Sequence, residues 1–133
     1  MKPFFESRIR SFGYAFSGWL YVFRTQHNAR IHGGIVLLVW VAGMWVNLPA
    51  RDWAVLVLTA ALVFVAEFVN TSIEAVVDLA SPAQHPLAKI AKDVGAAAVL
   101  ISALAAIAVG LLILGPPVWE KLAALPGASR STL

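Results

Sequence analysis

The chain has 133 residues, of which 60% are hydrophobic and only 13% are charged. Its mean hydropathy is +0.81. A water-soluble fold of this size could not hide so much apolar surface, so the composition excludes an ordinary soluble domain and indicates a single-domain, all-α integral membrane protein. Cysteine is absent, which excludes disulfides and thiolate metal sites. The net charge of +3 is modest, and we expect no nucleic-acid partner.

The N-terminal segment, about residues 4–28, is predicted to be an amphipathic helix on the membrane surface rather than a span. Its apolar residues recur at intervals of three and four, which gathers them on one side of a helix. They are Phe5, Ile9, Phe12, Phe16, Trp19 and Phe23. Arg8 and Arg10 lie largely on other sides. A helix packed against the bundle would show the same pattern, and the two interpretations are compatible.

Three apolar segments are predicted to cross the membrane, over about residues 30–48, 53–80 and 86–114. Within the third, residues 94–114 carry no charge and match the roughly 20 residues needed to cross a bilayer. The first two are joined by the short polar turn "NLPARD", so they must run antiparallel. We expect residues 1–115 to form the functional domain and residues 116–133 to form a short C-terminal extension.

The distribution of lysine and arginine predicts the orientation in the membrane. Seven of these residues fall in the N-terminal region or between the second and third spans: Lys2, Arg8, Arg10, Arg24, Arg30, Lys89 and Lys92. The other side has three: Arg51, Lys121 and Arg130. Because positive residues concentrate on the cytoplasmic side, we expect a multi-pass membrane protein with its N-terminus inside and its C-terminus outside.

The second span ends in an acidic stretch, "EFVNTSIEAVVD". On a helix with 100° per residue, Glu67, Asn70, Glu74 and Asp78 fall at about 0°, 300°, 340° and 20°, so they share one face. Glu67 would lie roughly 22 Å from the outer end of the helix, near the inner boundary of the hydrocarbon. A carboxylate inside a membrane is costly, so the default hypothesis is function, with Glu67 as general base. The alternative is a polar clamp between helices.

Positive charges occur at the same level on the next helix, in "HPLAKIAKDVGAAAV". Pro86 is a favoured first-turn residue, and Lys89, Lys92 and Asp93 follow on one face. Carboxylates opposite lysines suit a site for magnesium and phosphate, because the metal takes oxygen ligands and lysine neutralises phosphate. The small residues "GAAA" let helices approach closely or leave a crevice for an acyl chain. No glycine-rich phosphate loop occurs in the sequence.

These motifs together resemble the small bacterial membrane-integrated diacylglycerol kinase family, which includes the undecaprenol kinases. The resemblance covers about residues 7–114 and includes "SFGYAFSGW", "NARIH", "EFVNTSIEAVVD" and "HPLAKIAKD" in order. It implies a homotrimer whose subunits each have three spans and a surface helix. The implied reaction transfers the γ-phosphate of ATP, with Mg²⁺, to the hydroxyl of a membrane lipid at the cytoplasmic face.

The resemblance also implies roles for the polar stripe. Glu67 would be the general base, Asn70 would support it, and Glu74 would hold magnesium. Asp78 and Lys89 would support the cytoplasmic end. The residues implied to bind ATP, directly or through the metal, are Arg8, Tyr14, Glu74, His85, Lys92 and Asp93.

Two positions depart from the family pattern. Better-known members have a second metal-ligating glutamate where this chain has Gln26, and a position acidic in some members is His32 here. A glutamine carbonyl can ligate magnesium but brings no charge, so Gln26 would hold metal more weakly or through water. His27, His32 and His85 lack the spacing of a zinc site and are interpreted as interfacial or phosphate-adjacent.

Two other functions and the choice of acceptor remain open from the sequence. A proton- or ion-translocating bundle would use Glu67 as a relay but leaves the outer charged residues unexplained. A non-catalytic lipid-binding scaffold is suggested by the loss of a carboxylate at Gln26. The acceptor is undecaprenol or diacylglycerol, with "NARIH" and "HPLAK" looking closer to the undecaprenol-kinase branch.

Overall fold

The computed structural model describes residues 2–81, 83 and 85–125, with side chains from residue 8 onward. This part of the chain forms four helices: α1 (Lys2–Thr25), α2 (His27–Val46), α3 (Ala50–Ala80) and α4 (Pro86–Ala123). Helices α2, α3 and α4 are each long and apolar enough to cross a membrane, which confirms that the chain contains three long apolar helices. The side chains of Lys2 and Phe5, and residues 126–133 with Arg130, lie outside the described part.

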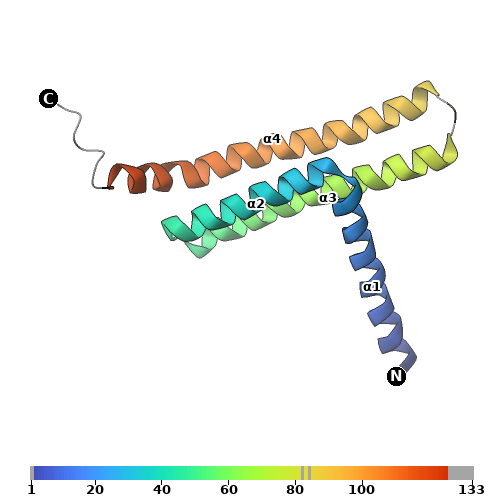
Figure 1. Ribbon diagram of the computed structural model, residues 1–133, viewed down its shortest axis with the longest axis horizontal. Coiled ribbons are helices and arrows are strands. Elements are labelled where there is room, and N and C mark those ends of the chain that lie inside the picture. Colours follow the sequence, from blue (N-terminus) through green and yellow to red (C-terminus); the bar gives the residue numbers. More distant parts are fainter. Residues whose placement is uncertain (1, 82, 84, 126–133) are drawn as a thin grey trace.

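The three apolar helices run side by side, and α1 leaves them at a steep angle (Figure 1). Helix α3 contacts all three of the others, and its packing against α4 is the most extensive. The last turns of α3 and the first turns of α4 extend beyond the junction of α1 with α2 (Figure 1). The charged residues of the α3–α4 turn therefore lie beyond the part of the bundle that α2 covers.

Short breaks separate the first three helices. Gln26 is the single non-helical residue between α1 and α2, with an extended backbone (φ −94°, ψ 117°). The break therefore comes before the predicted helix end at residue 28. Asn47 ends α2 in the left-handed conformation (φ 57°), which asparagine tolerates better than most residues. The Leu48 N–H then bonds to the Gly43 carbonyl at 3.0 Å, and Pro49 precedes α3.

Helix α4 begins where the sequence predicts but continues further. The Leu87 N–H donates to His85 Nδ1 at 3.2 Å, so His85 caps a helix whose first residue is Pro86. The predicted third span ends at residue 114, whereas α4 continues to Ala123. The added turns are held by Lys121, whose ammonium donates to the Trp45 carbonyl and lies 5.4 Å from the centre of the Trp45 ring.

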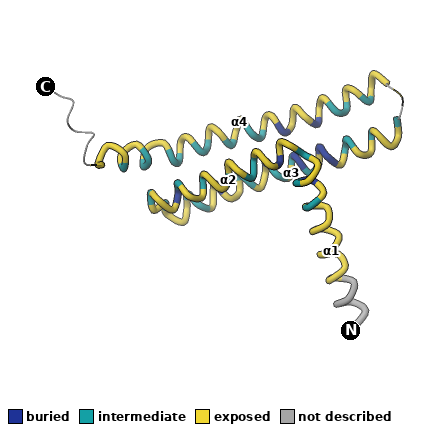
Figure 2. The backbone as a smooth tube through the Cα atoms, in the orientation of Figure 1, coloured by how far each residue is buried: buried dark blue, intermediate teal, exposed yellow. Residues whose placement is uncertain are grey.

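Most large apolar side chains of the spans face outward, as expected for contact with lipid or with another copy of the chain. Buried positions concentrate on α3 near the α1–α2 junction and on the facing part of α4 (Figure 2). The buried polar residues are Glu67, Asn70 and Thr71, all on α3. Glu67 is 1% exposed and is the largest fully buried side chain in the described part of the chain. The interior of this bundle is therefore centred on a carboxylate.

The close contact of α3 with α4 depends on Gly95. A Cβ atom at this position would lie 2.3 Å from Asn70 Oδ1, closer than real Cβ atoms come to other atoms. Asn70 is 7% exposed, and its amide nitrogen donates to Glu74 Oε1 at 3.1 Å. The small residue predicted to permit close helix approach thus contacts the polar stripe itself.

Replacing Gly95 with alanine is expected to destabilise the protein by about 1–3 kcal/mol, because the added methyl group forces Asn70 away from Glu74. Gly110 in the same helix is a matched control, since a Cβ atom there meets nothing within 4 Å. Gly110→Ala should leave stability unchanged or raise it slightly through helix propensity. Thermal unfolding in detergent, followed by tryptophan fluorescence, measures both variants. Equal unfolding temperatures would contradict the packing role of Gly95.

Candidate active site

Three side chains of α3 form a polar cluster inside the bundle. Glu67, Asn70 and Glu74 follow one another at helical spacing, so they point the same way. Glu67 and Asn70 are buried and Glu74 is half-buried. Asn70 Nδ2 donates to Glu74 Oε1 at 3.1 Å. The polar stripe predicted from the sequence is therefore the inward face of α3.

Gln26 joins this cluster from the break between α1 and α2. Its amide nitrogen donates to Glu74 Oε2 at 3.3 Å. Its side chain makes no capping hydrogen bond to the start of α2, although it occupies the N-cap position. The structure thus brings together the two side chains that the sequence analysis associated with metal, Gln26 and Glu74.

His32 approaches the carboxylate of Glu67 from α2. Its Nε2 lies 3.7 Å from Glu67 Oε1, and the two side chains are 17% and 2% exposed. From the sequence, His32 was identified only as a departure from the family pattern, and its contact with Glu67 was not predicted. A signal was available, because His32 falls within the predicted span 30–48, where a polar side chain needs a buried partner.

Two oxygen atoms in this cluster have unused hydrogen-bonding capacity. Glu67 Oε1 and Asn70 Oδ1 are buried without a hydrogen-bond partner among the described residues. Buried polar atoms are nearly always paired in folded proteins, so such exceptions indicate strain, an ion, a water or a functional role. Both atoms lie on the face of α3 that carries Glu74. The cluster is therefore suited to receiving a polar group from outside the chain.

A second, more exposed cluster surrounds the turn between α3 and α4. Lys92 Nζ lies 2.5 Å from Asp78 Oδ1, and Lys89 Nζ lies 2.6 Å from Asp93 Oδ2. Lys92 is the more sheltered lysine, with 38% of its side chain exposed against 78% for Lys89. The four residues come from the end of α3 and the start of α4. This proximity is expected from the sequence, which places them at the same depth relative to the membrane.

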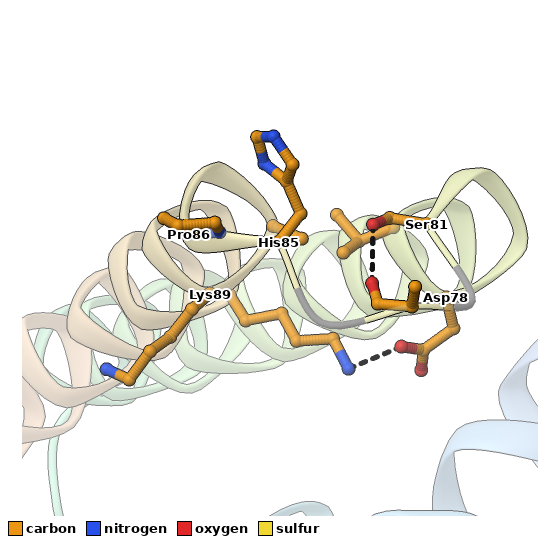
Figure 3. A pocket seen from close by; sticks show the side chains of 9 residues that line it. Asp78, Ser81, His85, Pro86 and Lys89 are labelled. Atoms are coloured by element: carbon orange, nitrogen blue, oxygen red, sulfur yellow. Dashed lines mark hydrogen bonds and ion pairs between the residues drawn. The ribbon is translucent and has the colours of Figure 1, made fainter.

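A cavity of about 720 Å³ lies in this second cluster. Its lining includes Asp78, His85, Lys89 and Lys92, and its volume is in the range of small-molecule sites. Figure 3 shows Asp78 at the end of a lysine side chain, whereas Lys89 and the His85 ring extend away from Asp78. Glu67 and Glu74 do not line this cavity, so the described residues form a buried group and an outer group along one face of α3.

The two residues predicted on the surface helix lie apart from both groups. Arg8 and Tyr14 are exposed on α1, and Tyr14 is 75% exposed. Neither lines the outer cavity within the described part of the chain. A single copy of the chain therefore brings together the residues of α3 and α4, with Gln26 and His32, but not those of α1.

Comparison with known proteins identifies the family. A sequence model of the family "Prokaryotic diacylglycerol kinase" matches residues 13–114, a stretch that contains both groups of polar residues. The chain is 48% identical over 108 residues to a diacylglycerol kinase of Synechocystis sp., covering 80% of this chain and 62% of that protein. It therefore spans less than two thirds of the length of this relative.

The match extends over most of the length of two other relatives. The chain is 37% identical over 108 residues to an undecaprenol kinase of Bacillus subtilis, covering 81% of this chain and 88% of that protein. It is 34% identical over 110 residues to a diacylglycerol kinase of Escherichia coli, covering 83% of this chain and 90% of that protein. By these matches the chain belongs to the prokaryotic diacylglycerol kinase family, a family of lipid kinases, which are phosphotransferases with an alcohol group as acceptor.

Proposed function

We propose that this chain uses ATP and Mg²⁺ to phosphorylate the hydroxyl group of a membrane lipid, undecaprenol or diacylglycerol, at the cytoplasmic face of the bacterial inner membrane. The observation that carries the proposal is the fully buried Glu67 on a membrane-spanning helix, next to a polar cluster that continues toward an outer charged cavity. Family membership supports phosphoryl transfer as the reaction. The similarity to a diacylglycerol kinase and an undecaprenol kinase supports a lipid acceptor.

In the proposed reaction Glu67 is the general base. Its carboxylate accepts the proton of the lipid hydroxyl while the hydroxyl oxygen bonds to the γ-phosphorus and the bond to the ADP oxygen breaks. The burial of Glu67 supports this role, since a water-excluding site keeps water from competing with the lipid for the phosphoryl group. Asn70 is proposed to hold the neighbouring Glu74 through its amide, at 3.1 Å.

The residues around Glu74 fit a magnesium site. The described residues contain no group of three or more histidine, aspartate or glutamate side chains that could hold a metal. Magnesium bound with a nucleotide does not need one, because it typically uses one or two carboxylates with phosphate oxygens and waters. We assign Glu74 as its carboxylate ligand and Gln26, whose amide already meets Glu74, as a weaker one. When bound, the ion would neutralise phosphate charge.

The nucleotide phosphates are proposed to bind near the outer cavity. Lys92 offers positive charge, Asp93 and His85 lie on the same part of α4, and Asp78 and Lys89 complete the charged lining. Arg8 and Tyr14 are proposed to approach ATP from α1 of the same or another subunit. Lys92 is paired with Asp78 in this structure, so phosphate would take the place of a carboxylate.

The assembly is proposed to be a homotrimer with α1 lying on the cytoplasmic surface, the N-terminus inside and the C-terminus outside. The outward apolar side chains of all three spans, such as Leu37, Leu58 and Leu104, offer surface for both lipid and neighbouring subunits. The exposed aromatic side chains of α1, including Phe12 and Phe16, support contact with the headgroup layer. Residues 1–115 are proposed as the kinase domain, and residues 116–133 have no proposed catalytic role.

Replacing Glu67 with glutamine is expected to lower lipid phosphorylation by about 10²- to 10⁴-fold, because the amide cannot accept the hydroxyl proton. The assay follows labelled γ-phosphate into lipid with purified protein, MgATP, and undecaprenol or diacylglycerol in mixed micelles. Asp52→Asn makes the same chemical change at the other end of α3 and should retain activity. Turnover of Glu67→Gln near the wild-type value would remove the base assignment, and a wild-type protein that labels neither lipid would favour the scaffold or ion-translocating alternatives.

Replacing Lys92 with glutamine is expected to raise the KM for ATP by about tenfold or more, because a charged hydrogen bond to phosphate is lost. Lys89→Gln is the matched comparison. Its smaller expected effect follows from its greater exposure and its pairing with Asp93 at the surface. Initial rates at varied ATP measure both variants. An effect of Lys89→Gln equal to or larger than that of Lys92→Gln would contradict the assignment.

Replacing Gln26 with glutamate is expected to lower the magnesium concentration that gives half-maximal activity, because two carboxylates would then face the same ion. Gln26→Met, which has similar length but no ligand oxygen, should raise that concentration. The lipid-labelling assay at fixed ATP and varied Mg²⁺ compares the two variants. Identical magnesium dependence in both would show that residue 26 does not contribute to the metal site.

A further inference from the structure

The proposed mechanism leaves unexplained how the Glu67 carboxylate is oriented. Glu67 Oε1 is buried and has no hydrogen-bond partner among the described residues. An unpaired polar atom in such a place costs free energy, and the cost is greater for a charged group. One candidate donor lies near this oxygen, His32 Nε2 at 3.7 Å.

The His32 ring is well placed to donate to this oxygen. It comes from α2, a different helix from the one that carries Glu67, so their separation is set by helix packing. Closing the contact to a hydrogen bond of about 2.7–3.2 Å requires a movement of under about 1 Å. Catalytic hydrogen bonds are often long in structures without substrate and shorten when the substrate binds.

The surroundings of His32 limit its alternatives. The ring lines a cavity of about 270 Å³ between the three spans, whose other lining side chains are mostly aliphatic or aromatic. Thr59 also lines this cavity, but its hydroxyl donates to the Val55 carbonyl within its own helix at 2.7 Å. The imidazole therefore has Glu67 as its polar neighbour on one side and apolar side chains on the other.

We propose that His32 is a positioning residue for the reaction: its Nε2–H holds Glu67 Oε1 and thereby directs the other carboxylate oxygen toward the lipid hydroxyl. This inference rests on the proposed function of Glu67 as base. His32 keeps its own proton throughout. The hydroxyl proton goes to Glu67, the new O–P bond forms on the lipid, and ADP leaves.

The test compares His32→Gln with His32→Met in the full-length protein. Both side chains have similar length, but only glutamine retains an N–H donor near the position of Nε2. The lipid-labelling assay measures kcat and the KM for MgATP and for the lipid. His32→Met is expected to lower kcat by about 10- to 100-fold, the usual effect of removing a group that orients a catalytic residue, with the KM for MgATP within about twofold of wild type. His32→Gln should recover most of kcat.

Each outcome decides the inference. Wild-type kcat in both variants would overturn it, because no donor would then be needed. Equal losses in both would also overturn it, since the loss would follow ring shape rather than hydrogen bonding. Should His32→Met fail to fold, His32→Phe takes its place, because it retains a ring without a donor. If wild-type protein phosphorylates neither lipid, the proposed function fails first, whereas active wild type with unaffected variants rejects only the role of His32.

Discussion

The structure depends on one constraint, the burial of a carboxylate inside a bundle whose outer faces are apolar. Glu67 is 1% exposed, and a buried carboxylate is tolerated only when polar groups surround it. The neighbouring helices contribute to these surroundings in different ways. Helix α2 brings His32 toward Glu67, while α4 brings Gly95, which leaves room for the Asn70 amide one turn away. Rotating either helix about its axis would replace these residues with apolar or larger side chains, so the polar cluster fixes how the spans pack.

The outer group of charges follows a different principle. Its carboxylates and lysines are paired with each other, Asp78 with Lys92 and Asp93 with Lys89. At the proposed nucleotide site, a phosphate group would compete for lysines that already have partners. Exposed pairs of this kind contribute little to stability, so the exchange would cost little. On this proposal, paired helical side chains would take the place of a glycine-rich loop.

The spans and the inward face of α3 could be predicted from the sequence, because each follows from a pattern along one helix. Contacts between side chains of different helices could not be predicted. The spans follow from uninterrupted apolar length, and the inward face of α3 follows from the spacing of Glu67, Asn70 and Glu74. The contact of Gln26 with Glu74 joins residues 48 positions apart. It depends on the helix break at Gln26, which the amino-acid composition of the segment does not indicate. For His32 the sequence marks a polar residue inside a span, but the crossing of α2 with α3 decides that its partner is Glu67. Helix α4 continues past its predicted end at residue 114, and in the added turns Lys121 contacts Trp45, a residue far away in the sequence.

The break at Gln26 has a mechanical consequence. Helix α1 contacts the spans near this residue, where the tilted rings of Phe23 and Phe64 have centres 5.6 Å apart. Trp19, also on α1, packs against Phe23 at 4.3 Å. The same break carries the amide that reaches Glu74. A helix that rests on the headgroups would tilt when the bilayer thins, curves or changes its lateral pressure. The Gln26 amide at its pivot contacts Glu74, so with α1 in the proposed surface position the physical state of the lipid would act on the geometry around Glu74.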